Sequence, residues 1–271
     1  MPESQTREHD AWLPSNGGER MIDGVDYGWQ MRDHIARYHF ARSYCVGKRV
    51  LDVATGTGYG AEILRNHGAL QVVAVDRDDD ALDYARRRYG TKALSWVKGD
   101  AYALPFEAEF DVVVSYETIE HLKDPERFAA ECRRVLKPGG VYIVSTPLNV
   151  GGPFVSIHHE LEFSPGEFQE LLGRHFSSIE MFGQRRELLP LVKPLGTIPD
   201  RYRESIMQTG KGSVRLFKFL DRVNKVPAHV VAWAMGYGES IRSQIRPLRD
   251  TLPMTPLLKP HYYAMIAICR P

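Results

Sequence analysis

The sequence predicts a doubly wound α/β fold built on a seven-stranded, mostly parallel sheet. Two observations support this prediction. From Lys48 onward, short apolar runs rich in β-branched residues alternate with segments of helical pattern, which is typical of parallel strands joined by crossover helices. A glycine-rich loop also follows the first apolar run directly, as it does where such sheets bind a ligand.

The expected strands are short and apolar. In chain order they are Arg49–Val53, Gln71–Asp76, Leu94–Lys98, Phe110–Tyr116, Val141–Thr146, Ser178–Phe182 and Tyr262–Cys269. The helices expected between them are Gly60–His67, Asp79–Arg88, Pro125–Val135 and Pro165–His175. Proline and glycine interrupt regular structure, so Lys137-Pro138-Gly139-Gly140 predicts a turn that ends one helix before the fifth strand.

Two segments fall outside this alternation and divide the chain into three parts. Residues 1–47 are an N-terminal extension whose second half, Trp29–Tyr44, is expected to be helical. Residues 187–260 separate the sixth and seventh strands and are too long for a simple connection. We expect this insert to be a helical cap over the ligand site, and a helical appendage that packs or forms a homodimer is the alternative. The domain itself then consists of residues 48–186 and 261–271.

Composition and charge are those of an ordinary globular protein. The 271 residues are 43% hydrophobic and 25% charged, and the formal net charge is +1. Proteins that bind phosphate backbones usually show a basic excess, so nucleic acid is not expected as a partner. The three cysteines lie far apart, the N-terminus lacks an apolar signal segment, and no apolar run approaches the roughly 20 residues of a membrane helix. We therefore expect a cytoplasmic protein without a membrane span.

The most informative stretch is the loop after the first strand, Val50-Leu-Asp-Val-Ala-Thr-Gly-Thr-Gly-Tyr-Gly60. Glycine lets the backbone turn sharply and lets a ligand approach without a Cβ in the way. The second strand ends in Asp76, where a carboxylate can accept both hydroxyl groups of a ribose. Asp100 follows the third strand, where an acid can reach an adenine amino group. These features together predict a cofactor that contains adenosine.

Residues 50–182 and the last strand resemble the class I S-adenosylmethionine-dependent methyltransferases, with several motifs in that family's order and spacing. The resemblance implies a Rossmann-like sheet closed by an antiparallel last strand. It also implies which residues bind the cofactor: Asp52, Gly56, Gly58 and Gly60 at the methionine part, Asp76 at the ribose, Asp100 and Ala101 at the adenine, and Arg77 and Tyr116 in the same site. A nicotinamide dehydrogenase is the rival interpretation, but its GxGxxG motif and hydride-transfer residues are not evident.

The predicted N-terminal helix contains His34-Ile-Ala-Arg37-Tyr38, shortly before the first strand. Similar helices in related methyltransferases fold over the cofactor, so the resemblance places His34 or Arg37 at the cofactor carboxylate. The alternative is a surface helix whose Tyr38 and Phe40 pack into the core.

A second set of polar residues follows the fourth strand, in Glu117-Thr-Ile-Glu120-His121. This segment is expected at the edge of the sheet where ligands bind in open α/β folds. If it is helical, the side chains of Glu117, Glu120 and His121 share one face of a single turn. Two carboxylates and an imidazole form a ligand set for a divalent ion. The alternative is a Glu-His pair that contacts only the acceptor or a hydrogen-bond partner.

The Glu-x-x-Glu-His pattern resembles the metal site of two methyltransferase branches: the ubiquinone-pathway catechol O-methyltransferases and the small-RNA 3′-terminal 2′-O-methyltransferases. In the RNA branch a further histidine precedes the next helix, and His159 matches it here. The resemblance implies Mg²⁺ or Mn²⁺ held by Glu117, Glu120, His121 and His159. His158 is then available to orient the acceptor or take its proton, with His121 and Glu117 as further catalytic candidates. Alternatively, both loop histidines bond to the backbone.

The chemistry favours an oxygen acceptor. Methyl transfer from a sulfonium requires the attacking atom to be held about 3–3.5 Å from the methyl group and its proton to be removed. A sugar hydroxyl is a very weak acid, and a divalent ion can lower its pKa and fix its position. We therefore expect a sugar O-methyltransferase of polysaccharide biosynthesis that acts on a small-molecule or oligosaccharide acceptor. It resembles the bacterial enzymes that methylate glycans, those of mycobacterial polymethylated polysaccharides included.

Other interpretations stay open. A catechol of quinone biosynthesis suits the same metal site, although that branch is usually shorter and lacks the insert. Small RNA is disfavoured by the near-zero net charge and the lack of an RNA-binding module. An inactive scaffold is disfavoured because both motifs are intact. The apolar patch at residues 230–233 of the insert suits a lipid-linked acceptor.

Overall fold

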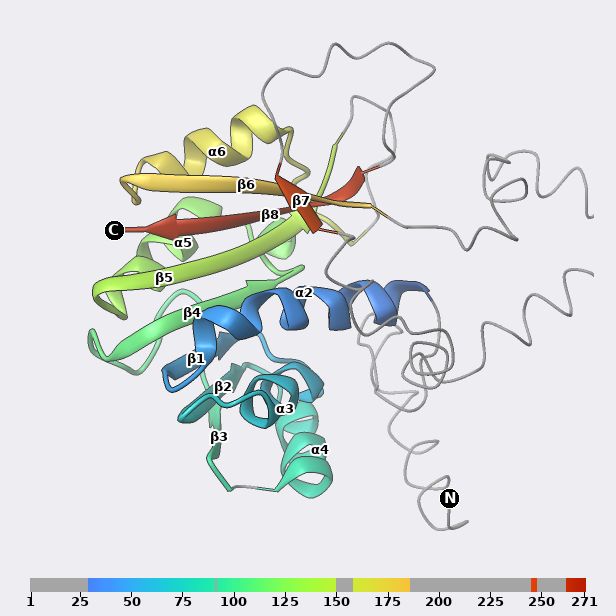
Figure 1. The fold of residues 1–271 in the computed structure, drawn as a ribbon, viewed down its shortest axis with the longest axis vertical. Coiled ribbons are helices and arrows are strands. Elements are labelled where there is room, and N and C mark those ends of the chain that lie inside the picture. The colour runs from blue at the N-terminus through green and yellow to red at the C-terminus, as the bar shows by residue number, and fades with distance from the viewer. Residues whose placement is uncertain (1–28, 91, 150–157, 186–244, 248–261) are drawn as a thin grey trace, which may run out of the picture.

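A sheet of eight strands runs through the computed structural model, in the order β3-β2-β1-β4-β5-β8-β6-β7 (Figure 1). The structure describes residues 29–90, 92–149, 158–185, 245–247 and 262–271. The strands are β1 (Arg49–Val53), β2 (Gln71–Asp76), β3 (Leu94–Lys98), β4 (Phe110–Tyr116), β5 (Leu136–Pro147), β6 (Ser178–Arg185), β7 (Ile245–Pro247) and β8 (Tyr262–Arg270). The helices are α2 (Trp29–Cys45), α3 (Tyr59–Asn66), α4 (Asp79–Tyr89), the short 3₁₀ helix η2 (Ile119–His121), α5 (Pro125–Arg134) and α6 (Pro165–Gly173).

The strand directions confirm the doubly wound α/β fold. Strands β1 to β5 pair in parallel, and β8 runs antiparallel between β5 and β6. The seven predicted strands and five predicted helices are all present, with small shifts at their ends. The eighth strand, β7, pairs antiparallel with β6 and belongs to the segment that the sequence predicted as a helical cap. The rest of that cap and residues 1–28 of the N-terminal extension lie outside the described residues.

One local prediction was wrong. The sequence predicted a turn at residues 137–140, but the structure includes these residues in β5. Phe110 pairs with Leu136 and Val112 pairs with Val141, so Asp111 alone lies opposite the four residues. The strand accommodates them as a bulge, with Gly139 at a φ of 75°. The glycine and proline are therefore compatible with an irregular strand start as well as with a turn.

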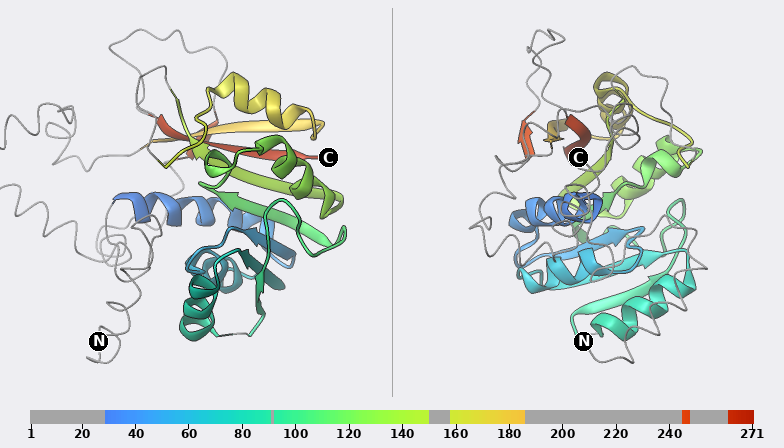
Figure 2. Two further views of the ribbon diagram at one scale, coloured as in Figure 1. Left: turned by 180° about the vertical axis from the view of Figure 1, so that it is seen from behind. Right: turned by 90° about the vertical axis from the view of Figure 1, so that its right-hand side faces the viewer.

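Helices cover both faces of the sheet, as Figure 2 shows from two further directions. Helices α2, α3 and α4 pack on one face, and α5 and α6 pack on the other. Successive side chains of β4 separate into these two cores: Val113 faces the α5 side, whereas Val112 and Val114 face the α2 side. Burial on both faces explains why these strands are continuous apolar runs in the sequence.

Polar residues fix the ends of the helices that flank the sheet. The Asp78 side chain accepts hydrogen bonds from two backbone amides at the start of α4. Ser164 and Glu167 form a reciprocal capping box at the start of α6. Among the described residues, no helix combines the length and apolar character required to cross a membrane.

Candidate functional site

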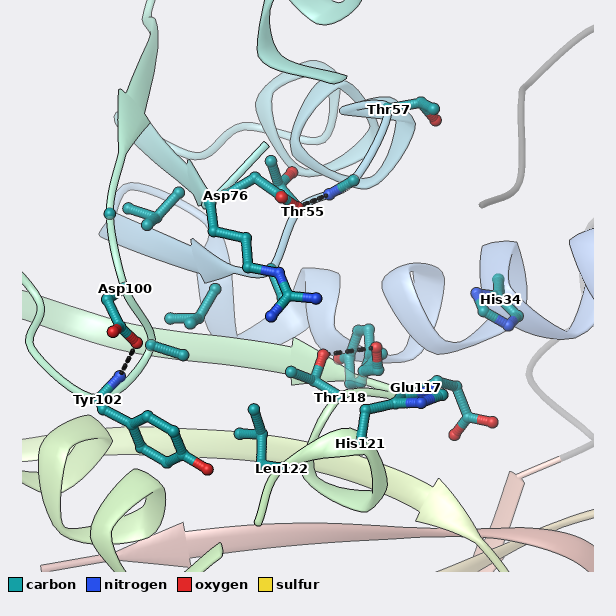
Figure 3. Close-up of a pocket in the computed structure, with 18 of the residues that line it drawn as sticks. His34, Thr55, Thr57, Asp76, Asp100, Tyr102, Glu117, Thr118, His121 and Leu122 are labelled. Carbon is teal, nitrogen blue, oxygen red and sulfur yellow. Dashed lines mark hydrogen bonds between the residues drawn. The ribbon is translucent and has the colours of Figure 1, made fainter. Parts of the chain in front are cut away.

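A pocket of about 510 Å³ opens at the carboxyl ends of β1, β2 and β4, the edge at which doubly wound sheets bind ligands (Figure 3). Asp76 and Asp100 enter it from the ends of β2 and β3, and Glu117, Thr118 and His121 from the segment after β4. Helix α2 adds His34 and Tyr38. The sequence predicted that the residues after β1 to β4 would meet at one site, and the structure brings them together.

Two backbone amides hold the carboxylate of Asp76. The Gly56 backbone N–H donates to its Oδ2 at 2.8 Å, and the Asp78 N–H donates to its Oδ1 at 3.1 Å. These bonds fix the carboxylate beside the glycine loop. The residue is 5% exposed. The predicted cofactor residues that line the same pocket are Gly56, Arg77, Asp100, Ala101 and Tyr116.

Asp52, predicted at the methionine part of the cofactor, lies behind the pocket wall. This carboxylate is fully buried and does not line the pocket. The Tyr38 hydroxyl donates to it at 3.2 Å and the Thr55 hydroxyl at 2.7 Å, and both donors do line the pocket. Burial raises the pKa of Asp52 to about 7 even though both hydrogen bonds oppose the shift. Asp52 therefore supports the pocket wall from behind.

Gly58 and Gly60, predicted at the cofactor as well, also lie outside the pocket lining. A Cβ on Gly60 would lie 1.9 Å from the Tyr38 ring, and one on Gly58 would lie 2.7 Å from the Trp96 ring. Gly58 in addition has a φ of 83°, which a side chain would strain. These two glycines allow α2 and β3 to pack closely on the loop, whereas Gly56 faces the pocket.

The two predicted residues of α2 have different surroundings. His34 lines the pocket, and its Nδ1 lies 2.9 Å from the Tyr59 hydroxyl. Burial and the charge of Arg37 lower the pKa of His34 to about 3, so the ring is neutral. Arg37 does not line the pocket and is 1% exposed. Of the two residues predicted for the cofactor carboxylate, His34 therefore lines the pocket, whereas Arg37 is buried in the protein.

Several pocket residues were missed by sequence reasoning, which concentrated on acids and glycines. They are Tyr38, Val53, Ala54, Thr55, Thr57, Tyr59, Val75, Gly99, Tyr102, Thr118 and Leu122. The hydroxyl residues that alternate with glycine in Thr55-Gly-Thr57-Gly were an available signal. Tyr38 combines two roles that the sequence analysis treated as alternatives, since it packs in the core and lines the pocket.

The segment after β4 is not one helical turn. Only Ile119–His121 form the 3₁₀ helix, whereas Glu117 has a φ of 49°, in the left-handed region. As a consequence Glu117 does not share a face with Glu120 and His121, which corrects the predicted arrangement. The Glu117 carboxylate accepts a hydrogen bond from the Ser145 hydroxyl at 3.0 Å and lies 3.2 Å from Arg37 Nη1.

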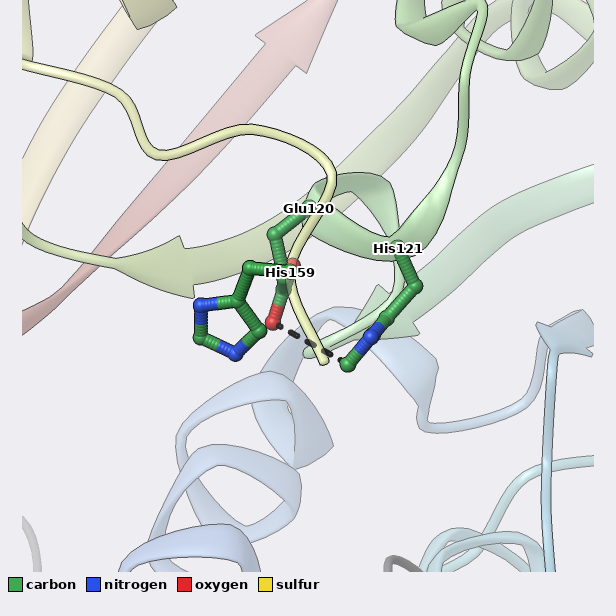
Figure 4. A group of neighbouring side chains, drawn as sticks. All are labelled: Glu120, His121 and His159. Carbon is green, nitrogen blue, oxygen red and sulfur yellow. Dashed lines mark ion pairs between the residues drawn. The ribbon is translucent and has the colours of Figure 1, made fainter. Parts of the chain in front are cut away.

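Glu120, His121 and His159 lie together beside the pocket (Figure 4). One potential metal-ligand atom from each residue lies within 4.8 Å of the others. Glu120 Oε1 is 4.0 Å from His121 Nε2, and the two imidazole rings are 5.1 Å apart in a T-shaped arrangement. The structure thus brings together three of the four predicted metal ligands and leaves Glu117 outside the group.

Hydrogen bonds orient both imidazole rings of this cluster. His121 Nδ1 lies 2.8 Å from the His158 backbone oxygen, and His159 Nδ1 lies 3.1 Å from the Glu162 carboxylate. Because those oxygens accept, each Nδ1 carries the proton, and each Nε2 retains a lone pair. Metal-binding histidines usually have such a partner on the second ring nitrogen.

Glu120 is the member of the cluster that most needs a cation. Its side chain is 1% exposed, and among the described residues neither carboxylate oxygen has a hydrogen-bond partner. Burial raises the pKa of Glu120 well above its usual range, and the negative charge of Glu117 raises it further. A divalent ion would neutralise this carboxylate. The three residues therefore fit a divalent metal ion.

Comparison with known proteins identifies the central part of the chain. Residues 51–144 match the family model described as a methyltransferase domain. A Mycolicibacterium smegmatis protein named Probable S-adenosylmethionine-dependent methyltransferase is 36% identical over 151 residues, covering 55% of this chain and 53% of the relative. The ubiquinone biosynthesis O-methyltransferase of Thiobacillus denitrificans is 38% identical over 114 residues, covering 41% of this chain and 49% of that protein.

A solved structure supports the same assignment. The methyltransferase in complex with the Trm112 methyltransferase activator of Haloferax volcanii superposes with a TM-score of 0.51 and 26% identity, covering 64% of this chain and 77% of that one. The chain spans about half the length of the curated relatives that it matches. Residues 51–144, which contain the glycine loop, Asp76, Asp100 and the segment after β4, are thus similar to a methyltransferase domain.

Proposed function

We propose that the protein is an S-adenosylmethionine-dependent, divalent-metal-assisted O-methyltransferase that acts on a hydroxyl group of a sugar or glycan. The observation that supports this function best is the position of Glu120, His121 and His159. His121 lines the same pocket as the cofactor candidates Asp76 and Asp100, so a metal-bound hydroxyl and the methyl donor would share one cavity.

The cofactor residues divide the pocket between them. Asp76 is assigned to the ribose hydroxyls, and Asp100 with Ala101 to the adenine. The neutral His34 and Tyr59 are assigned to the methionine part, where they offer hydrogen bonds but no charge. The Gly56 amide already donates to Asp76, which holds the carboxylate ready for the ribose.

The cluster residues are assigned to the acceptor. Glu120, His121 Nε2 and His159 Nε2 would hold Mg²⁺ or Mn²⁺, and the bound ion would supply the charge that orients two adjacent hydroxyls and lowers the pKa of one. His158 also lines the pocket, and we assign it to accept the acceptor proton. The residue is exposed, so the proton can pass on to solvent.

A catechol is the second candidate acceptor, and one observation favours it. The chain is similar over 114 residues to a protein named ubiquinone biosynthesis O-methyltransferase. Adjacent hydroxyls on a ring occur in sugars and in catechols, so the same cluster can orient either. We propose the sugar because Tyr102, Thr118 and His158 line the pocket with polar groups, which suit a hydroxyl-rich ligand.

The test is a methyl-transfer assay with S-adenosylmethionine and a panel of monosaccharides, oligosaccharides and catechols, first with Mg²⁺ and then with EDTA. Transfer to a sugar that EDTA abolishes is the expected result. Transfer to catechols alone would replace the acceptor and retain the metal. Transfer that EDTA does not affect would refute the metal assignment and leave a histidine as the general base.

A further inference from the structure

The buried Arg37 joins three segments that are distant in sequence. Its Nε donates to Gln184 Oε1 of β6 at 2.7 Å, and its Nη1 lies 3.2 Å from Glu117 Oε1 after β4. Gln184 in turn donates to the backbone oxygen of Asp33 in α2 at 3.0 Å. Of these two partners Gln184 is neutral and Glu117 is anionic.

The negative charge of Glu117 also acts on the metal cluster. Glu117 lies three residues before Glu120, and its charge acts on the buried Glu120 carboxyl. Its side chain is 19% exposed and lines the pocket, so it has room to rotate. The contacts of the Glu117 side chain with Arg37 and with Ser145 both use Oε1. These contacts keep the carboxylate on the side of α2 and out of the three-residue group.

We propose that Arg37 is a positioning residue that competes with the divalent ion for Glu117. In the structure Arg37 holds Glu117 apart from Glu120, His121 and His159. When the ion is bound, Glu117 rotates away from Arg37 and becomes a fourth protein ligand. This inference rests on the metal-assisted function proposed above and assigns to Arg37 a role in setting the affinity of that site.

The ion pair between Arg37 and Glu117 is expected to lower the affinity of the cluster for the ion. Separating Glu117 from the buried Arg37 loses the attraction of this ion pair, so the ion must offset that loss to recruit Glu117. The arrangement thereby lowers the affinity for the ion below that of a site with a free fourth carboxylate. Since Arg37 belongs to α2, which also carries His34 and Tyr38, the exchange connects the metal cluster to the cofactor side of the pocket.

The experiment is a double-mutant cycle on Mn²⁺ binding, measured by isothermal titration calorimetry on the full chain. The four proteins are wild type, Arg37→Gln, Glu117→Gln and the double variant. Arg37→Gln is expected to tighten Mn²⁺ binding roughly tenfold, the size of a coupling between contacting residues. In the Glu117→Gln background the same change is expected to have little effect, because no carboxylate remains to be released.

Two further variants serve as an independent test and as a control. Ser145→Ala removes the other contact of Glu117 Oε1 and is expected to tighten binding as well, even if Arg37→Gln fails to fold. Arg65→Gln removes an ion pair with Glu62 on α3, at 2.6 Å, and is the matched control that should leave Mn²⁺ affinity unchanged.

Each outcome has a separate meaning. Tightening of equal size with and without Glu117 would overturn the proposal, because it would report only the loss of a nearby positive charge. Unchanged or weaker binding in Arg37→Gln and Ser145→Ala would overturn it too. Absence of Mn²⁺ binding in all variants would refute the metal-assisted function itself, together with this inference.

Discussion

His159 and Glu162 form a hydrogen bond of 3.1 Å between the imidazole Nδ1 and a carboxylate oxygen, in the segment that precedes α6. The bond fixes the ring so that Nε2 is the nitrogen available to the cluster with Glu120 and His121. It also makes the imidazole a stronger ligand, since the carboxylate stabilises positive charge on the ring.

Glu162→Gln should therefore weaken Mn²⁺ binding by about 10- to 100-fold, the usual effect of losing such a partner. Calorimetric titration with Mn²⁺ measures it. The exposed Glu160, two residues earlier, provides the control, because Glu160→Gln changes the same charge without touching His159. Equal weakening in both variants would show that only the local charge matters.

Glu120→Gln is expected to separate stability from metal binding. The substitution leaves a polar amide of nearly the same size in the same buried position, so the free energy of unfolding should change by less than about 1 kcal/mol. Mn²⁺ binding should be lost at the same time, while the affinity for the cofactor stays near the wild-type value. Urea denaturation and titration calorimetry measure the two effects. A fall in stability would instead indicate that the carboxylate has a structural partner.

Asp76→Ala should affect the cofactor alone. The carboxylate faces the pocket and is held by the amides of Gly56 and Asp78, so its loss removes a charged hydrogen-bond acceptor. We expect the affinity for S-adenosylhomocysteine to fall roughly 10- to 100-fold. Asp80→Ala on the exposed face of α4 is the control. If both variants bind equally well, Asp76 does not hold the ribose.

Asp52 predicts a dependence of stability on pH. Its pKa is raised in the folded protein from its ordinary value of 3.8 to about 7, because the carboxyl is fully buried. A raised pKa means that its contribution to stability is complete below about pH 4 and is lost as the pH rises through 7. The loss is on the order of 4 kcal/mol. Asp52→Asn should flatten this part of the stability curve, measured by urea denaturation between pH 4 and 8; an unchanged slope would contradict the prediction.

Gly60→Ala tests how closely α2 packs on the glycine loop. The added methyl group would overlap the Tyr38 ring, so α2 must shift and the free energy of unfolding should fall by about 1–3 kcal/mol. Gly166→Ala is a matched control, because a Cβ there meets no atom within 4 Å and the residue lies in α6. That variant should be as stable as the wild type or slightly more stable. Similar losses in both variants would argue against the close contact.

The sequence was sufficient where function depends on the ends of parallel strands. Asp76 and Asp100 were predicted correctly as pocket residues because strand order alone brings those ends to one edge of the sheet. Asp52 belongs to the glycine-loop motif, but its side chain is buried behind the pocket wall. Its orientation depends on Tyr38, and the packing of α2 against the loop has no local signal in the sequence.

The acceptor side was less predictable for a related reason. Arg37 bonds to Gln184 of β6, which is 147 residues away along the chain. No local sequence pattern therefore predicts this contact. Glu117 was expected in a helical turn because Glu-x-x-Glu-His has helical spacing. Its left-handed φ of 49° instead sends the side chain toward Arg37, a backbone choice that residue type does not reveal.

The position of β8 between β5 and β6 has a consequence for biosynthesis. As a nascent chain leaves the ribosome, β6 cannot join the part of the sheet formed by β1 to β5 until β8 has been translated. At about 5–20 residues per second, synthesis of the intervening chain takes on the order of ten seconds. During that interval β1 to β5 can already pair and form the floor of the pocket, while β5 presents an open edge. We therefore expect the nascent protein to acquire its cofactor-binding strands before it loses its exposure to edge-to-edge aggregation.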